Sequence, residues 1–186
     1  MQDKLPIRKH PRLKEYDYSK AGYYFTTINT KNNLPILSNV ETEYINEIET
    51  HTPVGRGLAP AEKNVRLTTA GEIIKEQLIS LEDRYNYTIV QKYVIMPTHI
   101  HAIISIENET AGASPRPTIA DIICAFKSLT TRLCNTKDEI KGRKIWQASF
   151  YDHIIRNEQE YLKIWNYIDT NPAKWEDDEY YTMSAL

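Results

Sequence analysis

The chain has 186 residues and a formal net charge of −2, and this length predicts a single domain, spanning residues 1–186, with a hydrophobic core of its own. No apolar run approaches the roughly 20 residues of a membrane-spanning helix, and the first twenty residues lack the apolar core of a signal peptide. The two cysteines, Cys124 and Cys134, have no motif spacing and argue against a disulfide framework, so we expect a cytoplasmic protein with both thiols reduced.

The N-terminal half predicts a strand, a loop and a helix. Residues 22–30 are rich in aromatic and β-branched side chains, which favour a strand. Residues 54–64 contain Gly and Pro with little apolar content, and we expect a flexible loop there. Apolar residues then recur at helical spacing over 69–85, with Thr69 placed to cap the helix.

The next part of the chain predicts a hairpin and a second helix. Residues 87–96 and 99–107 both favour strands, and the two residues between them include a proline, as in a tight turn. Residues 108–117 predict a second flexible loop. An apolar stripe then predicts a helix over 118–135.

The remaining elements complete the order. Residues 145–156 predict a fourth strand, and residues 157–171 predict a final helix whose first turn carries Asn157 and Glu160 at capping-box spacing. The order β-α-β-β-α-β is the split βαβ pattern. We therefore predict an α+β, ferredoxin-like (RRM-like) fold, with helices packed on an antiparallel sheet and an additional C-terminal helix.

Two histidines stand one residue apart at the start of the third predicted strand. Residues i and i+2 of a strand point to the same face, so His99 and His101 project side by side while Ile100 and Ala102 face the other way. Neutral imidazoles are common ligands of divalent ions. The alternative is a pair of polar residues satisfied by hydrogen bonds or water, and a metal site needs a third ligand.

The final helix contains a candidate for that ligand. Tyr167 lies beside the apolar stripe of the helix, four residues before Asn171, a spacing that can bring together a nucleophile and an amide ligand. Each residue also has a structural interpretation: Tyr167 as a half-buried core tyrosine, and Asn171 as the last residue of a helix that ends before Pro172. The spacing leaves both interpretations open.

Basic residues are concentrated in residues 127–156, which hold seven Lys or Arg against three acids. Cations and aromatic rings side by side suit nucleic acid, because cations neutralise phosphates and rings stack on bases. The alternative is an ordinary solvated surface, and the distribution of charge taken alone favours this alternative. The candidates for contact with DNA are Lys127, Arg132, Arg143, Lys144 and Trp146.

Five segments together resemble the HUH single-tyrosine transposases, in particular the REP-associated tyrosine transposases. They are RLKEYDYSKAGYYFTTINTKN, YVIMPTHIHAIISI, IADIICAFKSLTT, IWQASFYDHIIRNEQEY and NYIDTNPAKW. The combination covers nearly the whole chain and is far more specific than any one segment. The resemblance implies that His99 and His101 bind a metal ion, that Tyr167 is the nucleophile, and that Asn171, where other members have Gln, is a third ligand.

The activity implied by this resemblance is cleavage and rejoining of single-stranded DNA through a 5′-phosphotyrosine intermediate. A covalent intermediate keeps the phosphoester energy, so no ATP is needed. The implied cofactor is a divalent metal, Mn²⁺ or Mg²⁺. The implied partner is single-stranded or hairpin DNA, bound by a monomer or homodimer associated with the bacterial nucleoid. The alternative is a catalytically silent DNA-binding module acting as a regulator, which the intact set of four site residues disfavours.

Overall fold

The computed structural model describes residues 20–43, 62–107 and 117–177, and four of its strands form one antiparallel sheet. In the sheet the strands are ordered β4-β5-β1-β6. Their bounds are Gly22–Asn29 for β1, Thr88–Ile95 for β4, His99–Ile106 for β5 and Tyr151–Ile155 for β6. The α+β, ferredoxin-like prediction is confirmed, because the first strand lies between the third and fourth strands of the split βαβ pattern.

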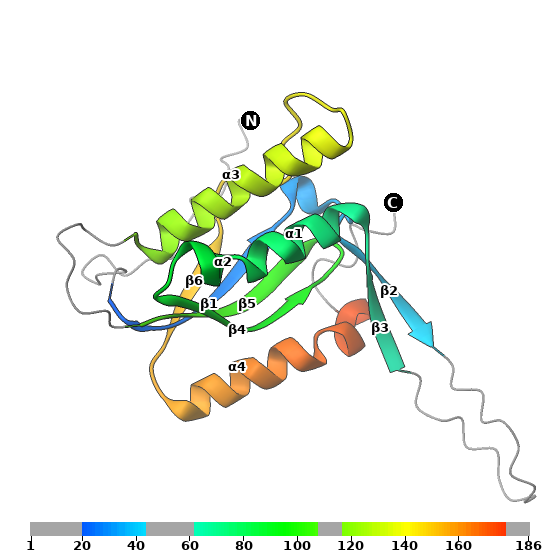
Figure 1. Ribbon diagram of the computed structural model, residues 1–186. Coiled ribbons are helices and arrows are strands. Elements are labelled where there is room, and N and C mark those ends of the chain that lie inside the picture. The colour runs from blue at the N-terminus through cyan, green and yellow to red at the C-terminus, as the bar shows by residue number, and fades with distance from the viewer. Residues whose placement is uncertain (1–19, 44–61, 108–116, 178–186) are drawn as a thin grey trace, which may run out of the picture.

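Helices cover both faces of this sheet (Figure 1). The helices α1 (Thr69–Ile79), α2 (Leu81–Arg84) and α3 (Ile119–Lys137) lie on one face. The helix α4 (Glu158–Thr170) lies alone on the other face and continues into the short 3₁₀ helix η2 (Pro172–Asp177). A second 3₁₀ turn, η1 (Lys31–Asn33), follows β1. Among the described residues, no helix is long and apolar enough to cross a membrane.

Strand β5 is buried on both faces, and its side chains point alternately into two separate apolar clusters. Ile100, Ala102, Ile104 and Ile106 join the main core under α1 and α3. On the opposite face, Ile103 packs with Ile155 and with the inner side of α4. His99 and His101 share the face of Ile103, so the histidine pair lies on the side of the sheet covered by α4.

A polar two-stranded ribbon, which the sequence analysis did not predict, precedes α1. The strands β2 (Ser38–Glu43) and β3 (Glu62–Leu67) pair antiparallel as a sheet of their own. The flexible loop predicted over 54–64 is therefore wrong for residues 62–64, and its residues 54–61 lie outside the described residues. The ribbon is tied to η2 by an ion pair between Lys63 and Glu176 at 3.0 Å.

Helix bounds also differ from the prediction. The cap of α1 is Thr68, whose side chain accepts a hydrogen bond from the backbone N–H of Gly71, and the predicted helix is interrupted at Ser80, which separates α1 from α2. Of the two cysteines, Cys134 is buried and Cys124 is exposed. The predicted loop over 108–117 falls outside the described residues except for Pro117.

The final strand and helix depart from the sequence prediction as well. The strand predicted over 145–156 is regular only over Tyr151–Ile155, preceded by an isolated bridge between Trp146 and Thr30. Asn157 caps α4 as predicted, but the Glu160 carboxylate accepts hydrogen bonds from the backbone N–H of Arg156 and from His153 in place of closing a capping box.

Gly71 should tolerate no side chain. A Cβ at this position would lie 2.0 Å from the carbonyl oxygen of Leu37, which is fixed because it accepts hydrogen bonds from the backbone N–H and the hydroxyl of Thr68. Gly71→Ala should lower the free energy of unfolding by about 1–3 kcal/mol, despite the better helix propensity of alanine. Urea denaturation measures this change. Thr69→Ala, at an exposed position of the same turn, should change it by about 0.5 kcal/mol or less; equal values for the two variants would contradict the close approach.

Candidate active site

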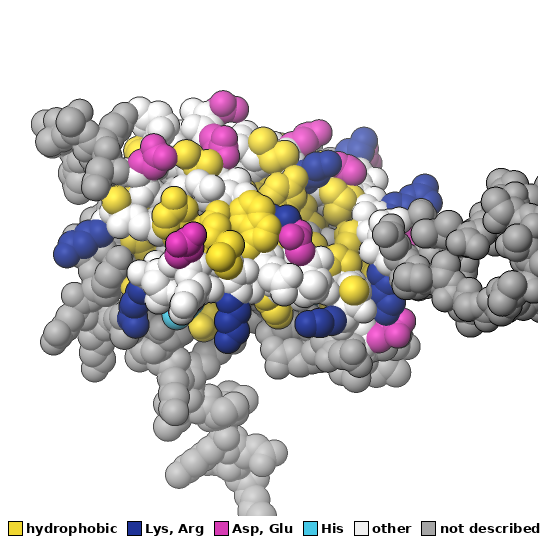
Figure 2. Space-filling model, turned by 90° about the horizontal axis from the view of Figure 1, so that it is seen from below, with side chains coloured by type: hydrophobic (Ala, Val, Ile, Leu, Met, Phe, Trp, Pro, Cys, Tyr) yellow, Lys and Arg dark blue, Asp and Glu magenta, His cyan; other side chains and the backbone are white. Residues whose placement is uncertain are grey.

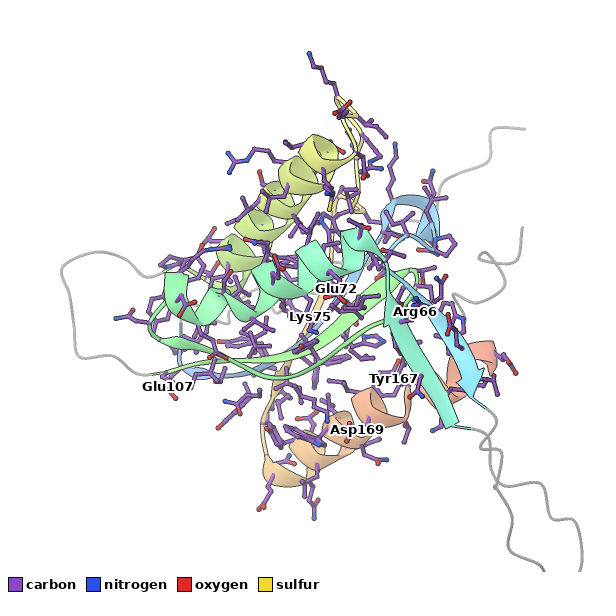
Figure 3. The ribbon with its side chains drawn as sticks, turned by 45° about the vertical axis from the view of Figure 1, so that its right-hand side comes forward. Arg66, Glu72, Lys75, Glu107, Tyr167 and Asp169 are labelled. Atoms are coloured by element: carbon purple, nitrogen blue, oxygen red, sulfur yellow. The ribbon has the colours of Figure 1, made fainter. Side chains whose placement is uncertain are left out.

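The two histidines and the tyrosine meet between the sheet and α4. The register of β1 against β5 sets Thr27 opposite His101 and Asn29 opposite His99. The Tyr167 hydroxyl lies 3.2 Å from Nε2 of His101, and in Figure 3 Tyr167 occupies the space between α4 and the sheet. The structure thus brings together residues that lie 66 positions apart in the sequence.

Threonine hydroxyls fix the orientation of both imidazoles. Thr27 Oγ1 is 2.9 Å from Nδ1 of His101, and Thr98 Oγ1 is 3.1 Å from Nδ1 of His99. A hydroxyl that accepts from Nδ1–H selects the tautomer in which Nε2 carries the lone pair. In this tautomer, Nε2 of His101 would accept a hydrogen bond from the Tyr167 hydroxyl. Both threonines are buried, so neither ring can turn without breaking a hydrogen bond away from water.

Burial keeps both imidazoles neutral. Removal from water lowers the pKa of His99 to about 4, although an interaction with the side chain of Asn171 acts in the opposite direction. Burial also lowers the pKa of His101 well below its ordinary value, and the neighbouring His99 adds to this shift. The ring centroids are 4.5 Å apart. Near neutral pH, the pair therefore presents lone pairs in place of charge, as a metal ligand or a hydrogen-bond acceptor must.

Tyr167 is partly exposed and is supported by aromatic contacts. Its side chain is 42% exposed, while Phe25 stacks on His101 and meets the Tyr167 ring edge-on, with centroids 5.3 and 6.1 Å away. The tyrosine oxygen is thus held against a buried nitrogen while its ring reaches solvent. This arrangement allows a large substrate to approach the hydroxyl.

The predicted apolar stripe of α4 docks the helix as expected. Ile168 is buried against Ile103 and Ile155, and Tyr161, Ile164 and Trp165 pack around them. On the β4 side, Lys92 forms an ion pair with Asp169 and lies over the ring of Trp165, 4.6 Å from its centroid. Seen from the side of the sheet that α4 covers, apolar surface occupies the middle of the molecule, with basic and acidic side chains around it (Figure 2).

Asn171 lies beside the histidines, at the end of α4. It is the C-terminal cap residue, as its structural interpretation required, and it is also buried next to His99. Its Oδ1 has no hydrogen-bond partner of normal geometry within the described part of the chain. Among the same residues there is no cluster of three His, Cys, Asp or Glu that could hold a metal. A metal in this site would therefore need the amide oxygen of Asn171 in addition to the two imidazoles.

Two of the five predicted DNA contacts have structural roles in this conformation. The Lys127 ammonium donates to the backbone carbonyls of Gln147, Ala148 and Ser149, at 2.6, 3.1 and 3.4 Å. Trp146 is buried; its Nε1–H donates to Thr130 Oγ1 at 2.9 Å. Its ring is therefore part of the core and cannot stack on a base without leaving it.

The other three predicted contacts lie at the surface. Arg132 and Lys144 are exposed, and Lys144 lines a shallow groove of about 300 Å³ on the α3 side. Arg143 forms an ion pair with Asp138 at 2.6 Å and donates to Asn135. All three are on the side of the sheet opposite Tyr167, so their role in DNA binding stays a prediction.

His153 has a structural role. Its Nε2 lies 2.7 Å from the Glu160 carboxylate, a contact that joins β6 to the first turn of α4. The sequence patterns did not identify this role, nor the residues that support the site: Phe25, Thr27, Thr98 and Trp175. Of these, Thr98 stands directly before the histidine motif, whereas the others come near only through sheet register and the fold of η2.

Substitutions of Lys127 and Lys144 should distinguish a lysine with a structural role from a lysine at the surface. Lys127→Met removes three hydrogen bonds from a charged donor and should lower the free energy of unfolding by about 1.5–3 kcal/mol. Lys144→Met, at an exposed position of the same groove, should change it by about 0.5 kcal/mol or less. Urea denaturation of the two variants tests this, and equal stabilities would show that the Lys127 contacts contribute nothing.

Comparisons with known proteins identify related chains. The family model described as "Transposase IS200 like" matches residues 60–171. An uncharacterized protein of Haemophilus influenzae is 30% identical over 189 residues, covering 94% of this chain and 93% of its own length. The REP-associated tyrosine transposase of Escherichia coli is 28% identical over 108 residues, 58% of each chain.

A solved structure shows the same fold. The REP-associated tyrosine transposase bound to a REP hairpin has a TM-score of 0.54 and 21% sequence identity to this chain, and the match covers 87% of this chain and 74% of that one. Its likeness establishes the shared architecture, and the family match covers the histidine pair, the tyrosine and the asparagine together. This chain belongs to the family of IS200-like transposases.

Proposed function

We propose that this protein cleaves and rejoins single-stranded DNA in a metal-dependent reaction, with Tyr167 as the nucleophile. The observation that carries the proposal is the hydrogen bond of 3.2 Å between the Tyr167 hydroxyl and Nε2 of His101, in a site that also holds His99 and Asn171. The hydroxyl of a partly exposed tyrosine, beside neutral and buried imidazole nitrogens, is suited to attack on a phosphodiester.

The donor set fits a divalent ion, Mn²⁺ or Mg²⁺. His99 and His101 are neutral and have their Nδ1 atoms next to threonine hydroxyls, so their Nε2 atoms would be the metal ligands, and the buried Oδ1 of Asn171 would supply a third. Two nitrogens and an amide oxygen suit Mn²⁺ especially, while Mg²⁺ prefers more oxygen ligands. When bound, the ion supplies charge neutralisation at the phosphate.

The chemical step exchanges one phosphoester for another. The Tyr167 oxygen loses its proton and bonds to phosphorus, the bond from phosphorus to the 3′ oxygen breaks, and the released 3′ oxygen takes up a proton. The number of ester bonds is unchanged, so the 5′-phosphotyrosine can be attacked in turn by a 3′-hydroxyl without ATP. Phe25 and the buried stripe of α4 hold the tyrosine ring in place during both steps.

The proposed substrate is hairpin or single-stranded DNA. The solved relative with the same fold is bound to a REP hairpin, and a covalent attack by a side chain needs a backbone that can bend into the space between α4 and the sheet. A folded hairpin with an unpaired extension meets both requirements, since the stem can bind the surface while the extension enters the site.

Removal of either histidine should abolish metal binding. Calorimetric titration with Mn²⁺ should detect binding to the intact protein and none to His99→Ala or His101→Ala, because each variant lacks a ligand. His153→Ala, on the same face of the sheet, should bind normally and serves as the matched control. Circular dichroism verifies that each variant is folded. Unchanged Mn²⁺ binding in both site variants would remove the metal from the proposal.

Replacement of Tyr167 by phenylalanine should separate metal binding from cleavage. The variant should bind Mn²⁺ about two- to tenfold more tightly, because Nε2 of His101 no longer has to give up its hydrogen bond to the Tyr167 hydroxyl in order to bind the ion. It should form no covalent adduct with end-labelled hairpin oligonucleotides, since the oxygen nucleophile is absent.

The adduct assay also identifies the outcomes that would contradict this assignment. Tyr151→Phe and Tyr161→Phe, which change the competing tyrosines, should still form the adduct. An adduct that persists in Tyr167→Phe and maps by peptide mass to another tyrosine would overturn the nucleophile while leaving the reaction intact. No adduct with the intact protein across hairpins from the source genome would favour a silent DNA-binding module.

A further inference from the structure

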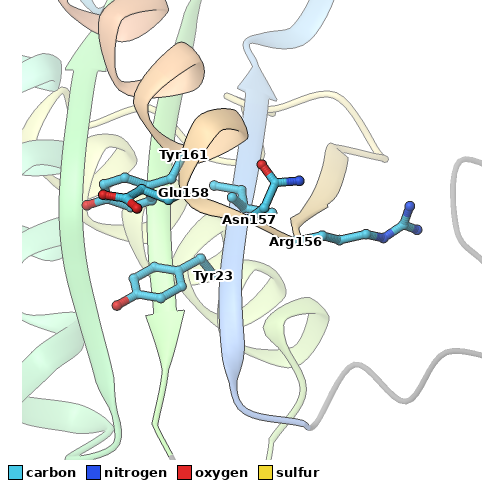
Figure 4. A pocket seen from close by; sticks show the side chains of 6 residues that line it. Tyr23, Arg156, Asn157, Glu158 and Tyr161 are labelled. Carbon is cyan, nitrogen blue, oxygen red and sulfur yellow. The ribbon is translucent and has the colours of Figure 1, made fainter.

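A separate cleft lies at the beginning of α4, at the other end of the helix from Tyr167. Its volume is about 430 Å³, and Figure 4 shows the side chains around it. The lining residues come from β1, from the end of β6 and from the first turn of α4: Tyr23, Ile155, Arg156, Asn157, Glu158 and Tyr161. None of these residues is the proposed nucleophile or a proposed metal ligand.

Two tyrosines give the cleft an aromatic wall. The rings of Tyr23 and Tyr161 meet edge-on, with centroids 5.3 Å apart and an interplanar angle of 72°. Tyr23 is 43% exposed, although it belongs to a central strand and large aromatic side chains favour burial. An exposed ring that is braced by a second ring, and so has little conformational entropy to lose, is suited to stacking on a planar ligand.

The charged groups of the cleft differ on its two sides. Glu158 precedes Tyr161 by three residues on α4, so the two side chains are neighbours on the helix surface, whereas in Figure 4 the Arg156 guanidinium extends away from both tyrosines. A carboxylate beside an aromatic wall accepts hydrogen bonds from the amino group of a base. A guanidinium at the opposite rim suits a phosphate. The pattern of ring, acceptor and distant cation matches a nucleotide, with its base inside and its phosphate outside.

The cleft lies within a few nucleotides of the proposed nucleophile. Tyr161 precedes Tyr167 by six residues on one helix, a rise of about 9 Å. On β1, Tyr23 precedes Thr27 by four residues on the same face of the sheet, a distance of about 13 Å, and Thr27 contacts His101. At about 3.4 Å for each stacked nucleotide, these distances correspond to three or four nucleotides.

We propose that the cleft formed by Tyr23, Tyr161, Glu158 and Arg156 binds one unpaired nucleotide of the substrate strand, three or four nucleotides from the cleavage point. The base stacks on the tyrosine wall, Glu158 accepts a hydrogen bond from its amino group, and Arg156 contacts the adjoining phosphate. The cleft thereby selects adenine, cytosine or guanine over thymine, which has no amino group. This inference rests on the proposed cleavage of single-stranded DNA and adds a position at which the strand is read.

The test measures binding to a hairpin with an unpaired extension. A series of hairpins carries one abasic nucleotide each, placed at successive positions of the unpaired extension, first on one side of the stem and then on the other. At one of these positions the abasic nucleotide should weaken binding to the intact protein. Tyr23→Leu and Tyr161→Leu keep apolar bulk but lose the ring, and each should weaken binding of the unmodified extension by roughly five- to 150-fold. In these variants the abasic substitution at that position should have no further effect. Tyr85→Leu, from an aromatic pair at the α2 end of the sheet, is the matched control and should bind normally.

Glu158→Gln tests whether the Glu158 carboxylate recognises the amino group of the base. The intact protein should bind an extension with thymine at the sensitive position more weakly than one with cytosine. The variant should lose this preference, because an amide can donate to the carbonyl of thymine. Unchanged binding by both tyrosine variants, or no sensitive abasic position, would overturn the proposed subsite.

A parallel adduct assay distinguishes failure of the subsite from failure of the proposed function. If the intact protein forms the Tyr167-dependent adduct while the tyrosine variants bind the extension normally, the subsite is wrong and the cleavage activity stands. If the intact protein forms no adduct and does not prefer an unpaired extension, the proposed function fails and the subsite fails with it.

Discussion

Two imidazoles buried side by side impose a strict requirement on the surrounding structure. A charged imidazole in this position would be removed from water next to a second one, and burial lowers the pKa of both accordingly. Neutral imidazoles still need partners for their N–H groups, which the hydroxyls of Thr27 and Thr98 provide. The β1–β5 register that supplies Thr27 is therefore also what directs Nε2 of His101 toward α4.

The position of α4 completes the site, and several independent contacts hold the helix there. Its buried stripe packs on Ile103 and Ile155. The contact between His153 and Glu160 joins its first turn to β6, and the ion pair between Lys92 and Asp169 joins its last turn to β4. Because opposite ends of the helix are attached to opposite edges of the sheet, Tyr167 is held over β5 in the middle. Such rigid placement is what a nucleophile on a helix requires.

Patterns of side-chain spacing predicted the central sheet and failed at the ribbon. The strands β1, β4 and β5 carry runs of apolar and β-branched residues that reflect burial, and these runs were readable. The ribbon strands, SNVETE and EKNVRL, are polar because the ribbon stands largely outside the core. Their pairing depends on each other and on η2, contacts between distant parts of the chain that have no local pattern.

The same difference between local patterns and long-range contacts explains which residues of the site could be predicted. His99, His101, Tyr167 and Asn171 were proposed from motif spacing and resemblance, whereas Thr27 and Phe25 were missed because cross-strand register cannot be read from one strand alone. Only the structure shows that the Tyr167 hydroxyl contacts the nitrogen that a metal would need. An Nε2 atom that is engaged by the Tyr167 hydroxyl is not available to an ion, so this hydrogen bond and a metal ligand at His101 would exclude one another.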